Sequence, residues 1–426
     1  MRDPEELGTV DTVPVLDPRT PLALGEALPR IAEAFTREGA RGVIALDASR
    51  LAGIERTYGG GALERALHNL AALAAELLGE CLGVSDQVVL GETGRAEVLV
   101  LLFREADEVE FYVRELPELR RKVLGGLARR GHRVAYPHLK HAPEVAVGTS
   151  AALRNPTIRG ETQIRDAIER ARDDAELESR IEHRARRRRL MELVGRGEIR
   201  SVYEPIVECK SRTVFGYEAL ARGPQGSPLH SPAVLFAMAD EQDLLFQLDC
   251  LCRRTGLAGA RDLPRGTKLF LNVRPTAIHD PGFRAEALIA TLGNLEIQPS
   301  DVVFEISEQE SIGSFEIFRE VRDYYKKLGF QIALDDTGSG YQSLESVMEL
   351  SPEFIKVDKS LVQGIDADPA RQELLRALRS VAERIGARII GEGLDTLEEL
   401  ETLGRLGIPF GQGWLFGKPQ PLSAGF

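Results

Sequence analysis

Two neighbouring carboxylates, Asp335 and Asp336, stand in the segment QIALDDTGSGY, which runs from Gln331 to Tyr341. The residues before them are typical of a buried strand, and those after them of a glycine-containing loop. Two like charges about 4 Å apart repel by roughly 4 kcal/mol at an effective dielectric constant of about 20. We therefore expect a cation between these side chains, and the pair predicts a metal site.

Polar residues also end most of the other strands predicted from residue 200 onward. The predicted strands are RSVYEPIV, TVFGYEAL, TKLFLNV, DVVFEIS, FQIALDD, EFIKVD, RIIGEG and PFGQGWLF, and helical patterns fit between most of them. This alternation predicts a TIM-like (β/α)8 barrel, in which chemistry takes place at the C-terminal ends of the strands. The polar residues at those ends are Glu218, Asn272, Glu305, Asp335, Asp336, Lys356, Asp358, Glu392 and Gln412.

The chemistry that these side chains support is set by their ligand atoms. They offer oxygen and amide groups without cysteine or histidine, which favours Mg²⁺ or Mn²⁺ over zinc. Two such ions a few ångströms apart activate water and hold a phosphoryl oxygen. Lys356 alternates with Ile355 and Val357, so it faces the barrel interior if those two residues pack against the outer helices.

The same residues carry a family resemblance. The segment YEALAR, from Tyr217 to Arg222, resembles the signature of EAL-domain phosphodiesterases, which hydrolyse cyclic di-GMP to linear pGpG. The resemblance covers about residues 200–420 and includes LNV at Asn272, FEISE, DDTGSGY, IKVD, GEGLDT and GQGWLFGKP. It implies a phosphodiesterase barrel over residues 198–426, with cyclic di-GMP as its substrate and a homodimer formed through this domain.

The resemblance also implies a role for each matching position. A first Mg²⁺ or Mn²⁺ ion would be held by Glu218, Asn272, Glu305 and Asp335, and a second by Asp335, Asp336 and Glu392. Lys356 would position or help activate the attacking water, with support from Gln412, so that Glu218, Lys356, Glu392 and Gln412 are the expected catalytic residues. Glu308 would anchor the loop after Asp336, and Asp358 would steady Lys356 or a ligand. Substrate binding or loop support is expected of Glu204, Leu220, Arg222 and Gly413.

Two positions depart from the family pattern. Thr337 replaces the phenylalanine that usually follows the aspartate pair, in a loop that links metal occupancy to dimer contacts. Glu204 precedes Pro205 where the family usually has glutamine, and a glutamate repels a dianionic substrate unless it faces the guanine edge. Neither change removes a metal ligand.

Two other functions remain open at this point. A barrel that binds cyclic di-GMP without turnover would serve as a receptor or signalling scaffold, and lost metal ligands would favour that alternative. Hydrolysis of other substrates, such as linear dinucleotides, would use the same metal chemistry.

An α/β domain is predicted over residues 26–158. Its segment LDASRLAGIERTYGGGALERAL resembles the GGDEF diguanylate cyclase family, with Asp47 at the metal aspartate and Glu55 and Arg56 at the guanine positions. The signature hairpin would be GRAEV, residues 94–98, in which Arg95 replaces a glycine, Ala96 replaces the catalytic acid and Glu97 remains acidic. We therefore expect a degenerate domain that makes no cyclic di-GMP; an unrelated α/β sensory domain is the alternative.

The remaining segments and the composition complete the expected organisation. Residues 1–25 read as an N-terminal arm, and the apolar spacing in 159–197 predicts a connecting helix. A net charge of -12 argues against binding to a DNA or RNA duplex. No apolar run reaches the roughly 18 residues of a membrane span. The acidic start lacks the apolar stretch of a secretory signal, and the four cysteines lack zinc-site spacing, so a reducing cytoplasm is expected.

Overall fold

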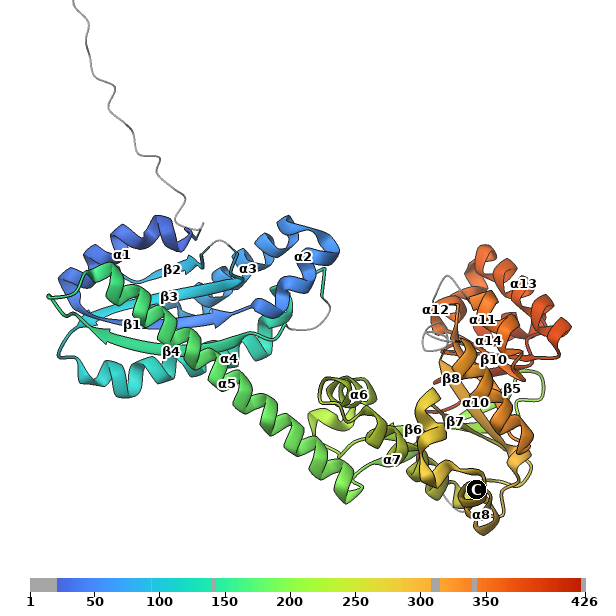
Figure 1. The fold of residues 1–426 in the computed structure, drawn as a ribbon. Coiled ribbons are helices and arrows are strands. Elements are labelled where there is room, and N and C mark those ends of the chain that lie inside the picture. Colours follow the sequence, from blue (N-terminus) through green and yellow to red (C-terminus); the bar gives the residue numbers. More distant parts are fainter. Residues whose placement is uncertain (1–20, 93, 140–142, 308–314, 339–342, 423–426) are drawn as a thin grey trace, which may run out of the picture. The chain divides into compact units, whose positions relative to one another are not determined.

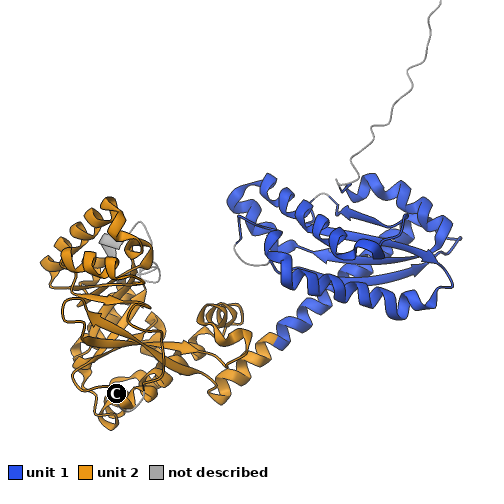
Figure 2. Cartoon of the chain, turned by 180° about the vertical axis from the view of Figure 1, so that it is seen from behind, with its two compact units in different colours: residues 1–185 blue, residues 186–426 orange. Residues whose placement is uncertain are grey.

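The computed structural model describes residues 21–92, 94–139, 143–307, 315–338 and 343–422. The chain divides into two compact units, Met1–Ala185 and Arg186–Phe426 (Figure 2). A long helix, α5 (Gly160–Arg196), includes the boundary between them and matches the predicted connecting helix closely. Among the described residues, no helix combines the length and the apolarity needed to cross a lipid bilayer.

The first unit is built on a four-stranded antiparallel sheet in the order β2-β3-β1-β4 (Figure 1). Its strands are β1 (Gly39–Asp47), β2 (Gln87–Leu90), β3 (Glu97–Glu105) and β4 (Ala146–Leu153). Its helices are α1 (Leu24–Glu38), α2 (Ala52–Tyr58), α3 (Gly60–Leu78) and α4 (Leu116–Arg130). Helix α1 begins at Leu24, inside the segment predicted as an arm.

Strand β1 is buried on both faces because helices cover the sheet on both sides. Ile44 and Leu46 pack with residues of α3 and α4, whereas Val43 and Ala45 pack with α1 and the first turns of α5. This alternation follows from the two-residue period of a strand. It explains why the strand reads as a continuous apolar run in the sequence.

Helix α4 contains a proline, Pro117, without a break in the helical backbone. A π-helical turn, Phe111–Glu115, leads directly into α4, and Pro117 lies in the first turn of that helix. Proline is tolerated there because the amide hydrogen it lacks has no partner within the helix.

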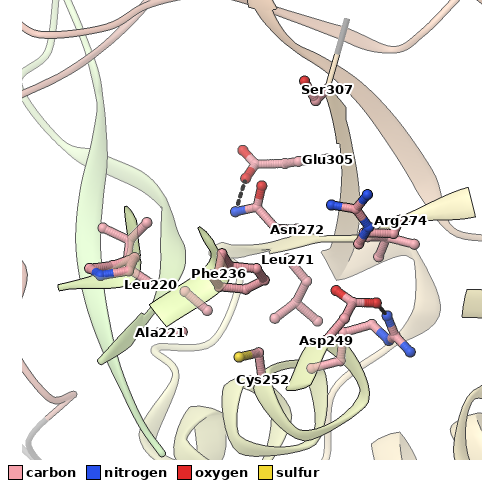
Figure 3. A pocket seen from close by; sticks show the side chains of 14 residues that line it. Leu220, Ala221, Phe236, Asp249, Cys252, Leu271, Asn272, Arg274, Glu305 and Ser307 are labelled. Carbon is pink, nitrogen blue, oxygen red and sulfur yellow. Dashed lines mark hydrogen bonds and ion pairs between the residues drawn. The ribbon is translucent and has the colours of Figure 1, made fainter. Parts of the chain in front are cut away.

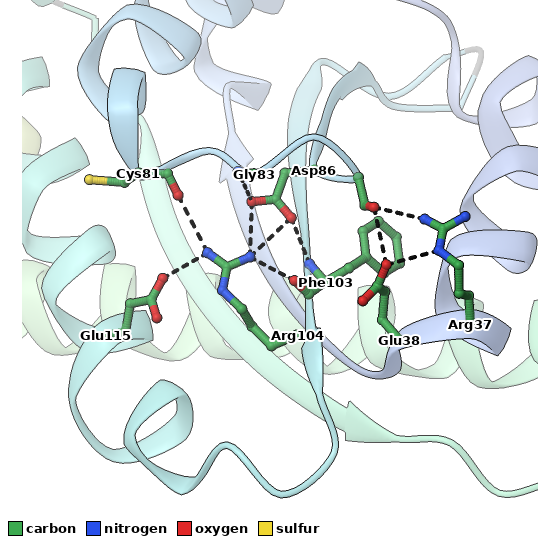
Figure 4. Close-up of polar contacts among 9 residues, drawn as sticks. Arg37, Glu38, Cys81, Gly83, Asp86, Phe103, Arg104 and Glu115 are labelled. Carbon is green, nitrogen blue, oxygen red and sulfur yellow. Dashed lines mark hydrogen bonds and ion pairs between the residues drawn. The ribbon is translucent and has the colours of Figure 1, made fainter.

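Arg104 on β3 connects three segments of the first unit (Figure 4). Its guanidinium lies 3.0 Å from Asp86 Oδ2 and 2.7 Å from Glu115 Oε1. Asp86 also accepts hydrogen bonds from the amides of Gly83 and Phe103, both at 2.7 Å. The loop before β2 and the π-helical turn are therefore fixed to the sheet by charged hydrogen bonds.

The second unit is a closed eight-stranded barrel in the order β10-β11-β12-β5-β6-β7-β8-β9. The strands are β5 (Arg200–Glu208), β6 (Val214–Arg222), β7 (Lys268–Asn272), β8 (Val302–Ser307), β9 (Gln331–Thr337), β10 (Phe354–Val357), β11 (Arg388–Gly391) and β12 (Phe410–Gln412). All eight predicted strands are present, which confirms the TIM-like barrel. The helices around it are α6 (Pro232–Glu241), α7 (Leu245–Ala258), α8 (Ala285–Asn294), α10 (Phe315–Lys327), α11 (Ser343–Leu350), α12 (Lys359–Val362), α13 (Pro369–Ile385) and α14 (Leu397–Arg405).

One strand departs from the all-parallel arrangement of an ideal (β/α)8 barrel. Strand β5 runs antiparallel to both of its neighbours, β6 and β12. The connection from β5 to β6 covers only residues 209–213, with Arg212 in the left-handed region at φ 57°. A connection this short joins antiparallel strands, whereas a parallel pair needs a longer crossover.

The barrel interior contains a separate apolar cluster beneath the polar strand ends. It consists of Ile206, Phe270, Val303, Ala333, Phe354, Ile390 and Phe410, with Phe215 packed against it. The larger core lies between the strands and the outer helices and includes Ile355 and Val357. Strand β10 therefore directs Phe354 and Lys356 inward and its other two side chains outward, as the sequence predicted.

Candidate active site

Lys356 lies at the centre of the polar end of the barrel. Its Nζ is 3.1 Å from Glu218 Oε2 and 2.9 Å from Glu305 Oε1. The same nitrogen is 3.3 Å from Asp335 Oδ1 and 2.7 Å from Glu392 Oε1. Because the residue is only 1% exposed, this ammonium group is a buried counter-ion shared by four carboxylates.

Two amide side chains connect the carboxylates on neighbouring strands. Asn272 Nδ2 donates hydrogen bonds to Glu218 Oε1 and Glu305 Oε2, each at 3.2 Å. Gln412 Nε2 donates to Glu218 Oε2 at 2.6 Å and to Glu204 Oε2 at 3.2 Å. Glu204 faces Glu218 directly in the antiparallel register of β5 and β6, which explains why one amide reaches both.

Asp336 shows how two adjacent aspartates reach the same site. Successive side chains of a regular strand point to opposite faces. Asp336, however, has a left-handed backbone with φ 57°, and the pairing of β9 with β10 shifts register at this end. Aspartate tolerates this conformation better than most residues. As a result, oxygens of Asp335, Asp336 and Glu392 all lie within 4.8 Å of one another.

The electrostatics of the site reflect too much negative charge for one cation. Burial disfavours a charged lysine, yet Asp335 and the other surrounding carboxylates raise the pKa of Lys356 well above its ordinary value. Burial and Glu218 raise the pKa of Glu305, and burial together with Asp335 raises the pKa of Asp336 to about 6. Burial also raises the pKa of Glu392, against the opposing effect of Lys356. An additional cation would therefore find uncompensated carboxylate charge here.

The donor atoms fit divalent cations that prefer oxygen ligands. Glu305 Oε1 and Asp335 Oδ1 are buried and accept no hydrogen bond; Lys356 approaches them only as an ion-pair partner. Together with the Asp335, Asp336 and Glu392 group, they form an all-oxygen set of the kind that binds Mg²⁺ or Mn²⁺.

A cavity of about 400 Å³ opens over this group of side chains. Seven of the residues singled out in the sequence line it, namely Glu204, Glu218, Asp336, Asp358, Glu392, Gln412 and Gly413. A Cβ at Gly413 would overlap the backbone of Leu394. The lining also includes Trp414, which was not among the residues expected from the sequence although it lies within the GQGWLFGKP motif.

A second cavity of about 270 Å³ lies beside Asn272 and Glu305 (Figure 3). Leu220, Phe236 and Arg274 are among its lining residues. Asp249, at the helical side of this cavity, forms an ion pair with Arg253. The expected residue Leu220 therefore lies next to the site, together with Phe236 and Arg274, which were not expected from the sequence.

Three other expected residues have different outcomes. Asp358 caps α12 by accepting a hydrogen bond from the Ser360 amide at 2.9 Å. It is not among the described ion-pair partners of Lys356. Arg222 donates to the Ala221 carbonyl at 2.8 Å, and burial lowers its pKa despite the nearby charges of Glu204 and Glu218. Glu308 lies outside the described residues.

The first unit has a cavity of its own at the predicted signature hairpin. Strands β2 and β3 form this hairpin, and Asp47, Arg95, Ala96 and Glu97 line a volume of about 470 Å³. Glu55 and Arg56 are not among its lining residues. Arg172 of α5 reaches into it and donates to Glu97, with 2.9 Å between Nε and Oε2. A guanidinium group thus neutralises the remaining acidic residue of the hairpin.

The barrel and its converging carboxylates define a known class of domain. The sequence profile of the EAL domain family matches residues 187–419, which is more than half of the chain. The protein therefore belongs to the EAL-domain family. The match begins one residue after the start of the second compact unit, so family and structure delimit the same barrel.

Two curated relatives illustrate the likeness. Probable cyclic di-GMP phosphodiesterase PdeG of Escherichia coli K12 is 31% identical over 237 residues, which are 54% of this chain and 46% of that protein. Cyclic di-GMP phosphodiesterase RocR of Pseudomonas aeruginosa is 30% identical over 230 residues, 53% of this chain and 58% of that protein. The chain thus spans about half the length of these relatives.

Solved structures share the fold. The FimX EAL domain of Xanthomonas citri, in complex with c-diGMP, aligns with a TM-score of 0.52 at 19% identity and covers 59% of this chain and 99% of that one. The EAL enzyme Bd1971, in a form bound to cAMP and cyclic-di-GMP, aligns with a TM-score of 0.51 at 21% identity, over 66% of this chain and 80% of that one. At these identities the likeness establishes the barrel architecture alone.

Proposed function

We propose that the second unit hydrolyses cyclic di-GMP to linear pGpG in a reaction that depends on divalent cations. The observation that carries this proposal is the buried group of Glu218, Glu305, Asp335 and Glu392 around Lys356. The names of the relatives PdeG and RocR support the same activity. No expected metal ligand is replaced in the sequence, which favours hydrolysis over a receptor or scaffold without turnover.

The proposed ligands divide into two overlapping sets. Glu218, Asn272, Glu305 and Asp335 would hold one Mg²⁺ or Mn²⁺ ion, and Asp335, Asp336 and Glu392 the other. When bound, such ions lower the pKa of water and offset the charge of a phosphoryl oxygen. The reaction adds water to one phosphodiester: the water oxygen bonds to phosphorus, the bond from phosphorus to the ribose 3′ oxygen breaks, and that oxygen gains a proton.

The chain's own side chains orient and balance these groups. Lys356 has a raised pKa, so it stays protonated and serves as a hydrogen-bond donor rather than a proton acceptor. The Gln412 amide fixes the Glu218 and Glu204 carboxylates relative to each other. Glu204 lies in the cavity wall, where its carboxylate could accept hydrogen bonds from a guanine edge.

The test is incubation of the full chain with cyclic di-GMP and Mg²⁺ or Mn²⁺, followed by chromatography of the products. Linear pGpG is expected, and excess EDTA followed by dialysis should abolish its formation. Replacing Mg²⁺ by Ca²⁺ should also block turnover, because calcium prefers longer bonds and more ligands. Tight binding without product would contradict hydrolysis and support a receptor, whereas turnover that persists in EDTA would contradict the metal requirement.

We also propose that the first unit is a catalytically inactive GGDEF-like domain that regulates the barrel. Arg95 and Ala96 in the hairpin, and the contact between Arg172 and Glu97, support the loss of synthesis. A homodimer through the barrel and a cytoplasmic location stay predictions.

A further inference from the structure

Trp414 is a large apolar side chain that the fold leaves exposed at the rim of the active-site cavity. It is 64% exposed and is the only tryptophan in the chain. The two residues that follow it, Leu415 and Phe416, pack against the core. Trp414 therefore turns away from its apolar neighbours and lines the cavity that contains Glu218, Asp336 and Glu392.

The backbone around Trp414 is firmly held. The Leu394 amide donates to the Gln412 carbonyl, and the Leu415 amide donates to the Leu394 carbonyl, both at 3.0 Å. The Phe416 amide donates to the Gly413 carbonyl at 3.1 Å. Because Gln412 is hydrogen-bonded to Glu218, this loop holds the backbone of Trp414 in place relative to the carboxylates.

The contacts of the indole fit a flat ligand group. Lys418 Nζ lies 4.9 Å from the centroid of the Trp414 ring, an arrangement that restrains the ring while leaving most of its area in solvent. The cavity floor is rich in carboxylates, which suit cations and, through them, phosphate groups. An aromatic ring at the rim offers a stacking surface that every nucleobase can use.

We propose that Trp414 is a stacking platform for one purine base of the dinucleotide substrate, so that it positions the phosphodiester over the carboxylates. This inference rests on the proposed function of the barrel. It assigns Trp414 a positioning role, because the indole would contact the base and not the reacting phosphorus. Its contribution should therefore be to substrate binding rather than to the chemical step.

Kinetics of three variants of the full chain test the assignment. Trp414→Ala should raise KM for cyclic di-GMP by about 5- to 150-fold, the range for one lost base stack, with little change in kcat. Trp414→Phe should restore most of the affinity, because it keeps an aromatic face. Leu374→Ala removes another exposed hydrophobic side chain, 51% exposed on α13 and away from the cavity, and should leave KM unchanged.

Fluorescence gives a readout that does not depend on turnover. Since Trp414 is the sole tryptophan, cyclic di-GMP added with Ca²⁺ in place of Mg²⁺ should change its emission, and inorganic phosphate should not. Unchanged KM in Trp414→Ala, or an equal response to phosphate, would overturn the stacking role while leaving hydrolysis intact. A wild-type protein that neither hydrolyses nor binds cyclic di-GMP would instead overturn the proposed function, and this inference with it.

Discussion

Glu218 is held by hydrogen bonds from the side chains of several other strands. It accepts hydrogen bonds from Asn272, Gln412 and Lys356, and these contacts lower its pKa although burial alone would raise it. The carboxylate is therefore ionised before any cation arrives. A group held in this way offers a metal ion a ligand that needs neither deprotonation nor reorientation.

Substitution at Glu218 should separate charge from hydrogen bonding. Glu218→Ala and Glu218→Gln should each lower turnover by more than about 100-fold, because loss of even an outer-shell partner of a metal ligand costs 10- to 100-fold. The alanine variant should also unfold at a lower temperature, since it leaves the Asn272 and Gln412 amides without this partner. The glutamine variant, which can still hydrogen-bond, should lose less stability. Near-normal turnover in either variant would remove Glu218 from the metal site.

Glu399 provides a pH-dependent contribution to stability at the start of α14. It accepts hydrogen bonds from the amides of Gly364 at 2.8 Å, Asp395 at 2.9 Å and Thr396 at 3.1 Å, and the last of these completes the capping box of α14. Burial opposes ionisation, but these amides outweigh it and lower the pKa of the carboxyl group. A depressed pKa in the folded state stabilises the fold above the unfolded value, near 4.3, and that stabilisation is lost as the pH falls through the folded value.

Glu399→Gln should therefore destabilise the barrel at pH 7 by about 1–2 kcal/mol, the range for hydrogen bonds to a charged group. The difference from wild type should shrink as the pH falls below the unfolded value, near 4.3, and should be lost once the folded wild-type carboxyl group is protonated. Urea unfolding at pH 7 and at a pH below the unfolded value, followed by Trp414 fluorescence, measures this difference in the free energy of unfolding. Glu398→Gln is the matched control, because Glu398 lies in the same helical turn but is exposed. An equal loss in both variants, or a loss that does not vary with pH, would contradict the capping argument.

At the scale of elements, the ion pairs that join α5 to the first unit differ in burial. Arg172 and Glu97 have side chains that are 10% and 6% exposed. Arg165, which precedes Arg172 on α5, pairs with Glu92 at 2.5 Å, and their side chains are 54% and 42% exposed. Removal of one partner from a buried ion pair strongly destabilises the fold, whereas an exposed ion pair contributes little to stability.

Arg172→Ala should lower the stability of the first unit by about 2–3 kcal/mol, because it leaves Glu97 buried without its cation. Amide hydrogen exchange should become faster in the part of α5 before Ala185, as measured by mass spectrometry. Arg165→Ala, on the same helix, should change stability by less than about 1 kcal/mol. If both variants exchanged alike, the Arg172 contact would not be what holds this helix.

The elements show which features the sequence could predict. Lys356 was assigned to the barrel interior from its alternation with Ile355 and Val357, because a strand leaves only two directions for a side chain. The antiparallel course of β5 was not predicted, although the short connection after it carries that signal. The convergence of Asp335 with Asp336 depends on a left-handed backbone, and the contact of Arg172 with Glu97 joins residues 75 positions apart. The neighbouring aspartates themselves predicted a shared metal site, but neither this backbone conformation nor the contact of Arg172 with Glu97 has a local signature in the sequence.

For the whole molecule, the first question is whether the first unit makes the compound that the second is proposed to consume. Ala96 cannot bind a metal ion, and Arg172 already neutralises Glu97 at the hairpin. Glu218→Ala provides a background in which any cyclic di-GMP would survive. GTP with Mg²⁺ should give no cyclic di-GMP in that variant, measured by chromatography. Its accumulation would show that the hairpin is not degenerate.

The second question is whether the first unit controls the barrel. Helix α5 is continuous from Gly160 to Arg196, and its two ends belong to different cores. Ile164 and Ile168 pack in the first unit, whereas Leu190 and Leu193 pack with barrel residues that include Ile199, just before β5. A change in how the first unit holds α5 would therefore reach the strand that carries Glu204.

A truncated chain that begins at Arg186 should differ from the full chain in turnover by several-fold to about a hundredfold, which corresponds to a coupling free energy of about 1–3 kcal/mol. The sign is set by which state of α5 the first unit favours, so either activation or inhibition supports coupling. Turnover, KM and oligomeric state are compared at matched protein and metal concentrations. Arg172→Ala in the full chain distinguishes coupling through the helix from a mere effect of chain length, because it loosens α5 without shortening the protein. It should shift turnover in the same direction as the truncation. Equal activity, affinity and assembly in all three proteins would leave the first unit without a regulatory role.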